Sequence, residues 1–121
     1  MNSTTKKDAK TARFIEWQGR QFAVDKEGFL INQYEWSQEL ALELAQLEGV
    51  TLSEEHWELM HYLREYHEDY DIAPPMRMMV RLMTKAFGDK VNSRYLQALF
   101  PQGPAKQGSR FAGLPKPKNC L

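Results

Sequence analysis

The sequence contains a single cysteine, Cys120, which lies second from the end of its 121 residues. One cysteine cannot close a disulfide within the chain, and it excludes any zinc or iron-sulfur site built from several cysteines. No apolar run approaches the ~20 residues that a membrane-spanning helix needs, and the polar N-terminus lacks the apolar stretch of a signal peptide. We therefore expect a soluble, cytoplasmic protein whose thiol stays reduced.

The sixteen basic and sixteen acidic residues cancel, yet they are unevenly distributed. Residues 1–75 hold fifteen acidic and seven basic side chains, and residues 76–121 hold one acidic and nine basic, so the two segments carry about −8 and +8. Two interpretations stay open. Either the segments neutralise each other within one domain, or a basic surface around the C-terminal end meets an acidic partner or RNA.

Length and periodicity predict one α+β domain, because 121 residues with 42% hydrophobic content suffice for a single modest core. Two β-prone runs around Gln18-Gly19 predict an N-terminal hairpin, to which residues 29–31 could add a short strand, giving a small antiparallel sheet. Apolar residues at helical spacing predict a helical bundle against this sheet, with helices over residues 34–48, 53–70, 75–87, 93–100 and 105–112.

The domain is expected to span residues 13–112. Residues 1–12 are polar and without periodicity, which is typical of a disordered segment. Residues 113–121 are expected to form a flexible C-terminal arm. Pro115 and Pro117 fix φ and favour extended neighbours, so this arm should project in a polyproline-like conformation rather than fold back.

Cys120 would then be an exposed thiol on an arm. An unperturbed thiol has a pKa of about 8.5, and the thiolate is its nucleophilic form. Lys116 and Lys118 favour the anion and the carboxylate of Leu121 opposes it, which leaves the direction of any shift open. A prenylation signal needs the cysteine fourth from the end, so this spacing excludes lipid anchoring.

The remaining basic and polar residues near the arm are candidates for partner docking. Lys116 and Lys118, with Arg110 at the base of the arm, are expected to guide docking electrostatically; alternatively they only keep the tail solvated. Asn119 and Leu121 are expected to be bound in a partner's pocket.

Two sets of potential metal ligands are assigned to structure instead. His56, His61 and His67 are five and six residues apart, whereas ligands on one helix face need a spacing of three or four. The methionines of residues 76–83 fit a core stripe better than a soft metal site. We therefore expect no metal and no cofactor.

The C-terminal run at residues 103–120, GPAKQGSRFAGLPKPKNC, resembles the arm of the DsrC/TusE sulfur-carrier family, whose penultimate cysteine carries sulfur as a persulfide. The resemblance extends over nearly the whole chain beyond the first dozen residues. Further matching positions are residues 25–30 (DKEGFL), Trp36, residues 52–57 (LSEEHW), Arg64 and residues 73–75 (APP).

One departure from the family pattern is informative. Members that work with dissimilatory sulfite reductase carry a second cysteine eleven residues before the last, and Ser109 stands there in this chain. Serine cannot form the linkage associated with two-cysteine members. The resemblance therefore implies the single-cysteine, TusE-like branch, which relays sulfur for tRNA 2-thiouridine formation. It also implies a TusBCD-like complex as sulfur donor and a tRNA 2-thiouridylase as acceptor.

Two alternatives remain. The chain could be a DsrC-like protein associated with sulfite reductase. It could also be a DNA-binding regulator, because residues 76–100 are compatible with a helix-turn-helix-like pair whose cations meet phosphates. The second helix of that pair, at residues 93–100, is short and largely apolar, which favours a scaffold role over base reading.

Overall fold

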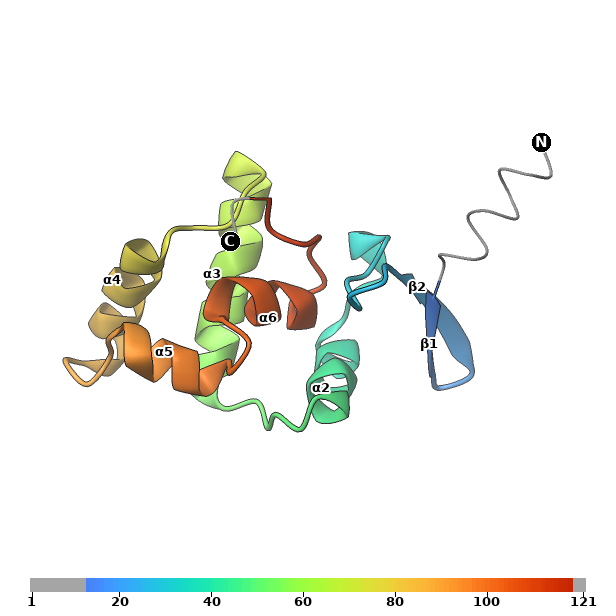
Figure 1. Ribbon diagram of the computed structural model, residues 1–121, viewed down its shortest axis with the longest axis horizontal. Helices are drawn as coiled ribbons and strands as arrows, with labels where there is room; N and C mark the ends of the chain where they lie inside the picture. Colours follow the sequence, from blue (N-terminus) through green and yellow to red (C-terminus); the bar gives the residue numbers. More distant parts are fainter. Residues whose placement is uncertain (1–12, 119–121) are drawn as a thin grey trace.

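The computed structural model describes residues 13–118, and it consists of a hairpin followed by a group of helices (Figure 1). The predicted α+β class is confirmed, whereas the expected disorder of residues 1–12 lies outside the described residues. None of the helices in residues 13–118 is both long and apolar enough to cross a membrane. In chain order the elements are β1 (Arg13–Trp17), β2 (Arg20–Val24), the 3-10 helix η1 (Gln33–Glu35), α2 (Gln38–Leu47), α3 (Glu54–Tyr70), α4 (Met76–Phe87), α5 (Ser93–Leu99) and α6 (Pro104–Phe111).

The predicted hairpin is confirmed. Strands β1 and β2 pair antiparallel, and the two turn residues Gln18 and Gly19 have φ values of 51° and 73°. Positive φ at both positions is what a two-residue hairpin turn requires. The predicted third strand is reduced to a single bridge between Val24 and Leu30. A turn at Asp25 separates them, in which the Asp25 carboxylate accepts hydrogen bonds from two backbone amides.

The helix expected over residues 34–48 begins later than predicted. Ser37 is extended and its hydroxyl accepts the Leu40 amide, so α2 starts at Gln38 and the preceding residues form only η1. Side-chain capping of this kind satisfies an amide that the first helical turn leaves without a partner. The other helices differ from their predicted bounds by one residue at most.

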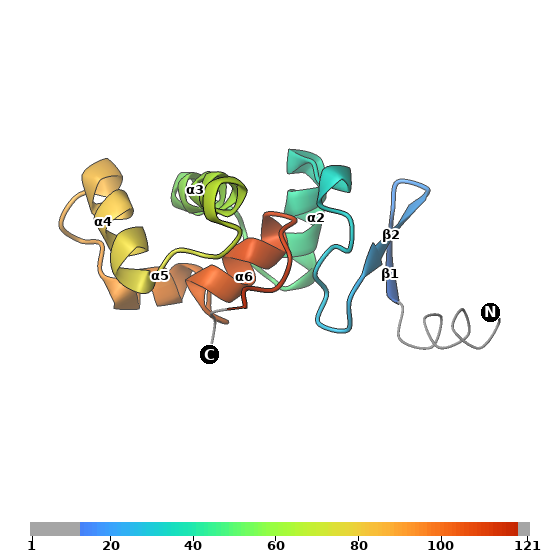
Figure 2. The same cartoon turned by 90° about the horizontal axis from the view of Figure 1, so that it is seen from above.

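Helix α3 is the centre of the core, and α6 lies directly against it (Figures 1 and 2). The close approach depends on Gly108, since a Cβ atom there would lie 2.7 Å from Cδ1 of Leu63. Met79 and Met83 of α4 are buried in the same core, as the apolar stripe predicted. Helix α3 therefore fixes the position of α6, and with it the start of the C-terminal segment.

Helices α4 and α5 pack as a scaffold rather than as a base-reading pair. The seven-residue α5 contacts both α4 and α6, and Leu96 at its centre is fully buried. A recognition helix needs several exposed side chains that reach base edges. The geometry of α5 thus weighs against the DNA-binding alternative.

The two oppositely charged segments pair with each other inside the domain. Four ion pairs join a cation after residue 75 to an acid before it, and the Arg110–Glu48 pair is well shielded from solvent. The intramolecular interpretation of the charge asymmetry is correct for these four cations. The pairs are Lys90–Glu55, Lys106–Glu27, Arg110–Glu48 and Lys116–Glu27.

His56 ties the start of α3 to the end of α5. Its Nδ1 accepts the Ser53 amide at 3.0 Å, so the neutral ring carries its proton on Nε2, which donates to the Leu99 carbonyl at 2.8 Å. Burial lowers the pKa of His56 below its usual value, although the Leu99 carbonyl and the Glu55 carboxylate oppose the shift. Protonation would place an N–H opposite the Ser53 amide and disrupt the cap.

The His56 pKa predicts a pH dependence of stability. At pH 7.5 the ring is neutral in both states, and below about pH 6.5 the unfolded chain binds a proton that the folded protein resists, so the free energy of unfolding should fall between about pH 7 and 5. His56→Gln should flatten this slope in urea titrations at several pH values. His61→Gln, which removes an exposed histidine from the same helix, is the control; an equal slope in wild type and His56→Gln would contradict the assignment.

Candidate functional site

The last turn of α6 is held at two backbone carbonyls. Trp36 donates its Nε1–H to the Phe111 carbonyl at 2.8 Å, and Arg64 donates from Nη1 to the Ala112 carbonyl at 2.7 Å. The final carbonyls of a helix have no partner within the helix, so these bonds complete its C-terminus. They also fix the direction in which the chain leaves the domain.

Trp36 and Arg64 also contact each other. The Arg64 guanidinium lies 4.2 Å from the centre of the Trp36 ring, a cation–π arrangement. Burial lowers the pKa of Arg64, and the Glu68 carboxylate partly offsets this shift. The pKa of an arginine lies so far above neutral pH that the guanidinium stays charged. Its hydrogen bond to the Ala112 carbonyl is therefore charge-assisted.

Gly113 completes this arrangement, which we call the exit clamp: Trp36, Arg64 and Gly113. The residue has φ = 74°, and a Cβ atom there would collide with the Cβ and the indole ring of Trp36. Both the backbone conformation and the lack of space require glycine. The clamp thus combines two hydrogen bonds with one steric constraint.

The first part of the expected arm packs against the domain instead of projecting. Leu114 is 5% exposed and donates its amide to the Ser109 carbonyl, and Pro117 is also buried. The proline geometry restricts φ but leaves the segment free to lie on a surface, and burying a leucine contributes roughly 1.5–3 kcal/mol. The expectation of projection from residue 113 is therefore wrong for residues 113–117.

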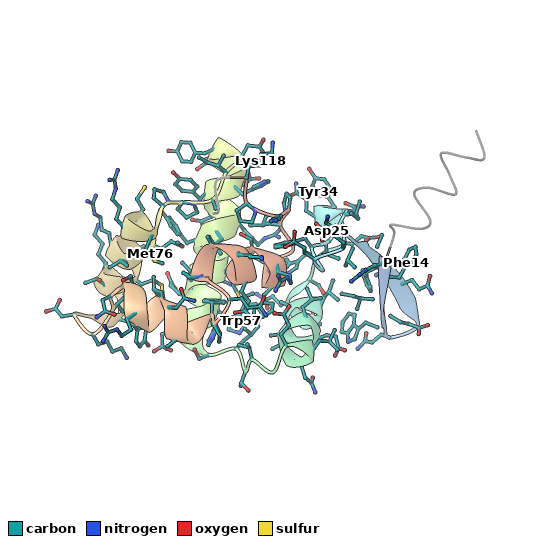
Figure 3. The ribbon with its side chains drawn as sticks, in the orientation of Figure 1. Phe14, Asp25, Tyr34, Trp57, Met76 and Lys118 are labelled. Atoms are coloured by element: carbon teal, nitrogen blue, oxygen red, sulfur yellow. The ribbon has the colours of Figure 1, made fainter. Side chains whose placement is uncertain are left out.

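Lys116 and Lys118 are both exposed at the surface, and their role in docking stays a prediction. Lys116 additionally lies 2.7 Å from a Glu27 carboxylate oxygen, and Lys106 lies 3.3 Å from the other oxygen. These two ammonium groups lower the pKa of Glu27, Lys116 more than Lys106. Lys118 is labelled beside the C-terminal end of α3 in Figure 3, and it lines the same cavity as His67. The predicted roles of Asn119, Cys120 and Leu121 concern residues outside the described range.

Arg110 is buried within the domain, contrary to the expectation that it guides docking from the base of the arm. It is 6% exposed, its Nη1 donates to Glu48 and Gln102, and its guanidinium lies over the Phe29 ring. Gln107 donates to the same Glu48 carboxylate. Arg110 therefore anchors α6 to the end of α2 and to the turn that begins at Asp25, because its charge is already paired inside the domain.

A cavity of about 260 Å³ lies between the packed arm and α3. Ser109, the residue in place of the second cysteine, is 2% exposed and borders it from α6. Helix α3 contributes His67, and residues 114–118 form the opposite wall. A second hollow of about 470 Å³ continues past Arg64 to Tyr34, sharing His67 and Leu114 with the first. The two hollows adjoin each other at their shared residues, and we call them together the groove; residues 114–118 line its first hollow.

Exposed apolar side chains border this groove, and the sequence patterns did not single them out. Tyr34 is 88% exposed on η1, and Tyr70 and Ile72 are exposed where α3 ends. Tyr34 and Ile72 line the two hollows. Exposed aromatic residues beside a groove are typical of protein interfaces. An aromatic residue in the polar η1 segment is the signal that could have pointed to Tyr34.

Within residues 13–118, no three histidine, aspartate or glutamate side chains come together as ligands for a metal ion. The groove offers packing surface and charge. Its features are those of a carrier domain: a small α+β body with a clamped exit, from which a short segment leads to one thiol-bearing residue.

The chain belongs to the DsrC-like protein family, whose model matches residues 16–121. It is 47% identical over 108 residues to the sulfurtransferase TusE of Sodalis glossinidius, covering 88% of this chain and all of the relative. It is 45% identical over 104 residues to the TusE homolog of Haemophilus influenzae, covering 85% and 95%. The predicted family is thereby confirmed.

Solved structures of the family have the same fold. The oxidized gamma-subunit of dissimilatory sulfite reductase (DsrC) from Archaeoglobus fulgidus superposes with a TM-score of 0.81 at 40% identity, covering 90% of this chain and all of that one. DsrC of Allochromatium vinosum superposes with a TM-score of 0.77 at 50% identity, covering 91% and 99%. Family, fold and the sulfurtransferase relatives together support a sulfur-carrier role for this chain.

The exit clamp generates a matched pair of variants. Gly113→Ala should lower the free energy of unfolding by about 1–3 kcal/mol more than Gly19→Ala, since forced overpacking costs about this much. Gly19 has a nearly identical φ of 73°, but a Cβ atom there would meet nothing within 4 Å, so it isolates the backbone strain. If urea denaturation gave equal losses of unfolding free energy for the two variants, the Trp36 side chain would be moving aside at no energetic cost, and the steric constraint would be contradicted.

Proposed function

We propose that this protein accepts a sulfur atom on Cys120 as a persulfide and relays it to an acceptor enzyme for tRNA 2-thiouridine synthesis in the cytoplasm. The observation that carries the proposal is the single cysteine, placed a few residues beyond a clamped helix end in a chain whose full-length relatives are TusE sulfurtransferases. A TusBCD-like complex would supply the sulfur, and a tRNA 2-thiouridylase would receive it.

The loading step is a thiol exchange. The Cys120 thiolate attacks the terminal sulfur of the donor's persulfide, a new S–S bond forms, and the donor's S–S bond breaks with its cysteine leaving as thiolate. Delivery repeats the exchange in the opposite sense, with Cys120 as the leaving thiolate. Electrons balance at each step without any cofactor, because the transferred sulfur keeps its oxidation state.

The groove supports this role through geometry. Two residues of extended chain span about 7 Å, so a partner that reaches Cys120 also meets Lys118 and the side chains that border the groove. Tyr34 and Ile72 would supply apolar contact, while Lys118 would supply positive charge near the anionic persulfide. The exit clamp would give each partner the same starting point for the arm, which limits the entropy lost on docking.

A role with sulfite reductase is the second candidate, favoured by the 50% identity to DsrC of Allochromatium vinosum. Ser109 weighs against it, because the resemblance places a second cysteine there in members of that kind. Sulfur loading alone does not separate the two roles. The identity of the acceptor does: transfer to a tRNA 2-thiouridylase supports our proposal, and productive transfer only with sulfite reductase contradicts it.

Replacing Cys120 with serine should abolish sulfur loading. This substitution replaces only the sulfur atom with oxygen, so the thermal unfolding midpoint should stay unchanged. Intact mass after incubation with a cysteine desulfurase, cysteine and the donor complex should show wild type heavier by one sulfur, reversed by a reductant, and the variant unaltered. A variant that still gains reducible sulfur would show that the carrier site lies elsewhere.

Ser109→Cys should permit a disulfide with Cys120 under mild oxidation. The position borders the cavity along which residues 114–118 run, and a disulfide needs Cβ atoms about 3.5–4.5 Å apart. Counting free thiols after oxidation of the dilute protein should give none for this variant and two for Ser93→Cys, an exposed position on α5. Two remaining thiols in both variants would mean that Cys120 does not reach the cavity.

A further inference from the structure

Helix α4 presents an unbroken line of positive charge to solvent. Arg77, Arg81 and Lys85 follow one another at intervals of four residues, and all three are exposed, while Met79 and Met83 on the opposite face are buried. At a rise of 1.5 Å per residue the three charges extend over about 12 Å. The helix contains no acidic residue. Figure 3 shows long nitrogen-tipped side chains extending from α4 into solvent.

These three cations differ from four of the other cations in residues 76–118, whereas Arg94 and Lys118, like them, form no ion pair within residues 13–118. Lys90, Lys106 and Arg110 form ion pairs with acids of the first half of the chain, whereas no acidic side chain pairs with the α4 cations in residues 13–118. Like charges four residues apart repel one another, so the arrangement disfavours the isolated helix. An ordinary solvated face would mix both signs. The α4 cations therefore fit an anionic ligand outside the domain.

The surroundings of the α4 cations identify the kind of anion. Exposed large apolar side chains occur in the described chain only up to residue 72, and none occurs in residues 73–118. Protein interfaces depend on aromatic and apolar anchors, whereas a phosphate backbone is held mainly by arginine and lysine. The face consequently suits nucleic acid better than an acidic protein. Since α5 is short and half-buried, phosphate contact without base reading is expected.

We propose that the Arg77, Arg81 and Lys85 face binds the phosphate backbone of transfer RNA while the arm delivers sulfur. The choice of tRNA rests on the proposed function, in which the acceptor enzyme holds this RNA. Helix α4 and the hairpin lie at opposite ends of the molecule, with α3 and the last described arm residues between them (Figure 1). One end would thus contact RNA while the groove beside α3 contacts protein.

The test measures binding of the full chain to an unmodified tRNA transcript by fluorescence anisotropy at salt concentrations of about 50–300 mM. The variant is Arg77→Gln, Arg81→Gln, Lys85→Gln. The matched control is Arg13→Gln, Arg20→Gln, Lys26→Gln. It also removes two arginines and one lysine, but from exposed positions in and after the hairpin. A DNA duplex of similar length serves as a competitor.

The α4 variant should lose at least about tenfold in affinity at 0.1 M salt, and the slope of log K against log salt should flatten by about 2–3, as expected for three phosphate contacts. The hairpin variant should change little. Thermal unfolding of the α4 variant should occur at the same temperature or higher, because the substitutions remove repulsion. Cys120 of the α4 variant should load sulfur from the donor complex at the wild-type rate, since no RNA takes part in that step.

Equal losses in the two triple variants, a preference for the DNA duplex, or no tRNA binding by wild type at the lowest salt would each overturn this inference. None of these outcomes affects sulfur loading, which tests the proposed function separately. If wild type fails to load sulfur while its tRNA binding depends on the α4 cations, the carrier role is contradicted and the RNA-binding surface is supported.

Discussion

Two hydrogen bonds to the last carbonyls of α6 set the geometry on which the rest of the molecule depends. Trp36 reaches them from η1 and Arg64 from α3, so three elements that are remote in sequence meet at the root of the arm. The apolar core serves this arrangement: Gly108 lets α6 approach α3 closely enough for Arg64 to reach the Ala112 carbonyl. A fixed exit matters for a carrier, because a short segment whose starting point moved would sample many more positions relative to a partner.

The division of positive charge follows the same logic. Arg110 is buried against Glu48 and Phe29, where its ion pair with Glu48 offsets the cost of removing the charge from water. Lys106 and Lys116 share the Glu27 carboxylate at the surface, where ion pairs are weak and sensitive to salt. Arg77 and its neighbours on α4 have no acidic partner in residues 13–118. The buried cation thus anchors the scaffold, and the cations that share Glu27 hold the arm on the domain. The unpaired cations of α4 are the ones we propose to bind an external anion.

The sequence predicted what local chemistry decides. The hairpin turn at Gln18-Gly19 and the Ser53 cap of α3 depend on neighbouring residues, so they could be recognised without coordinates. Arg110 could not be assigned in this way, because an arginine near an arm has the same appearance whether it docks a partner or pairs with Glu48, 62 residues away. The burial of Leu114 was missed for a related reason, since it lies beside Gln33 and Leu63, which are more than fifty residues away in the sequence. The resemblance marked Trp36 and Arg64, but only their contacts reveal what they hold.

The spacing of these contacts along the chain has a consequence for biosynthesis. The Trp36 bond spans 75 residues and the Lys116–Glu27 pair spans 89, so both join the early part of the chain to its last part. Contacts of such separation form only after the intervening helices have been made and packed. During synthesis the earlier helices can therefore pack before the root of the arm is fixed. The packed course of residues 113–117 is determined last, by a domain that is already assembled.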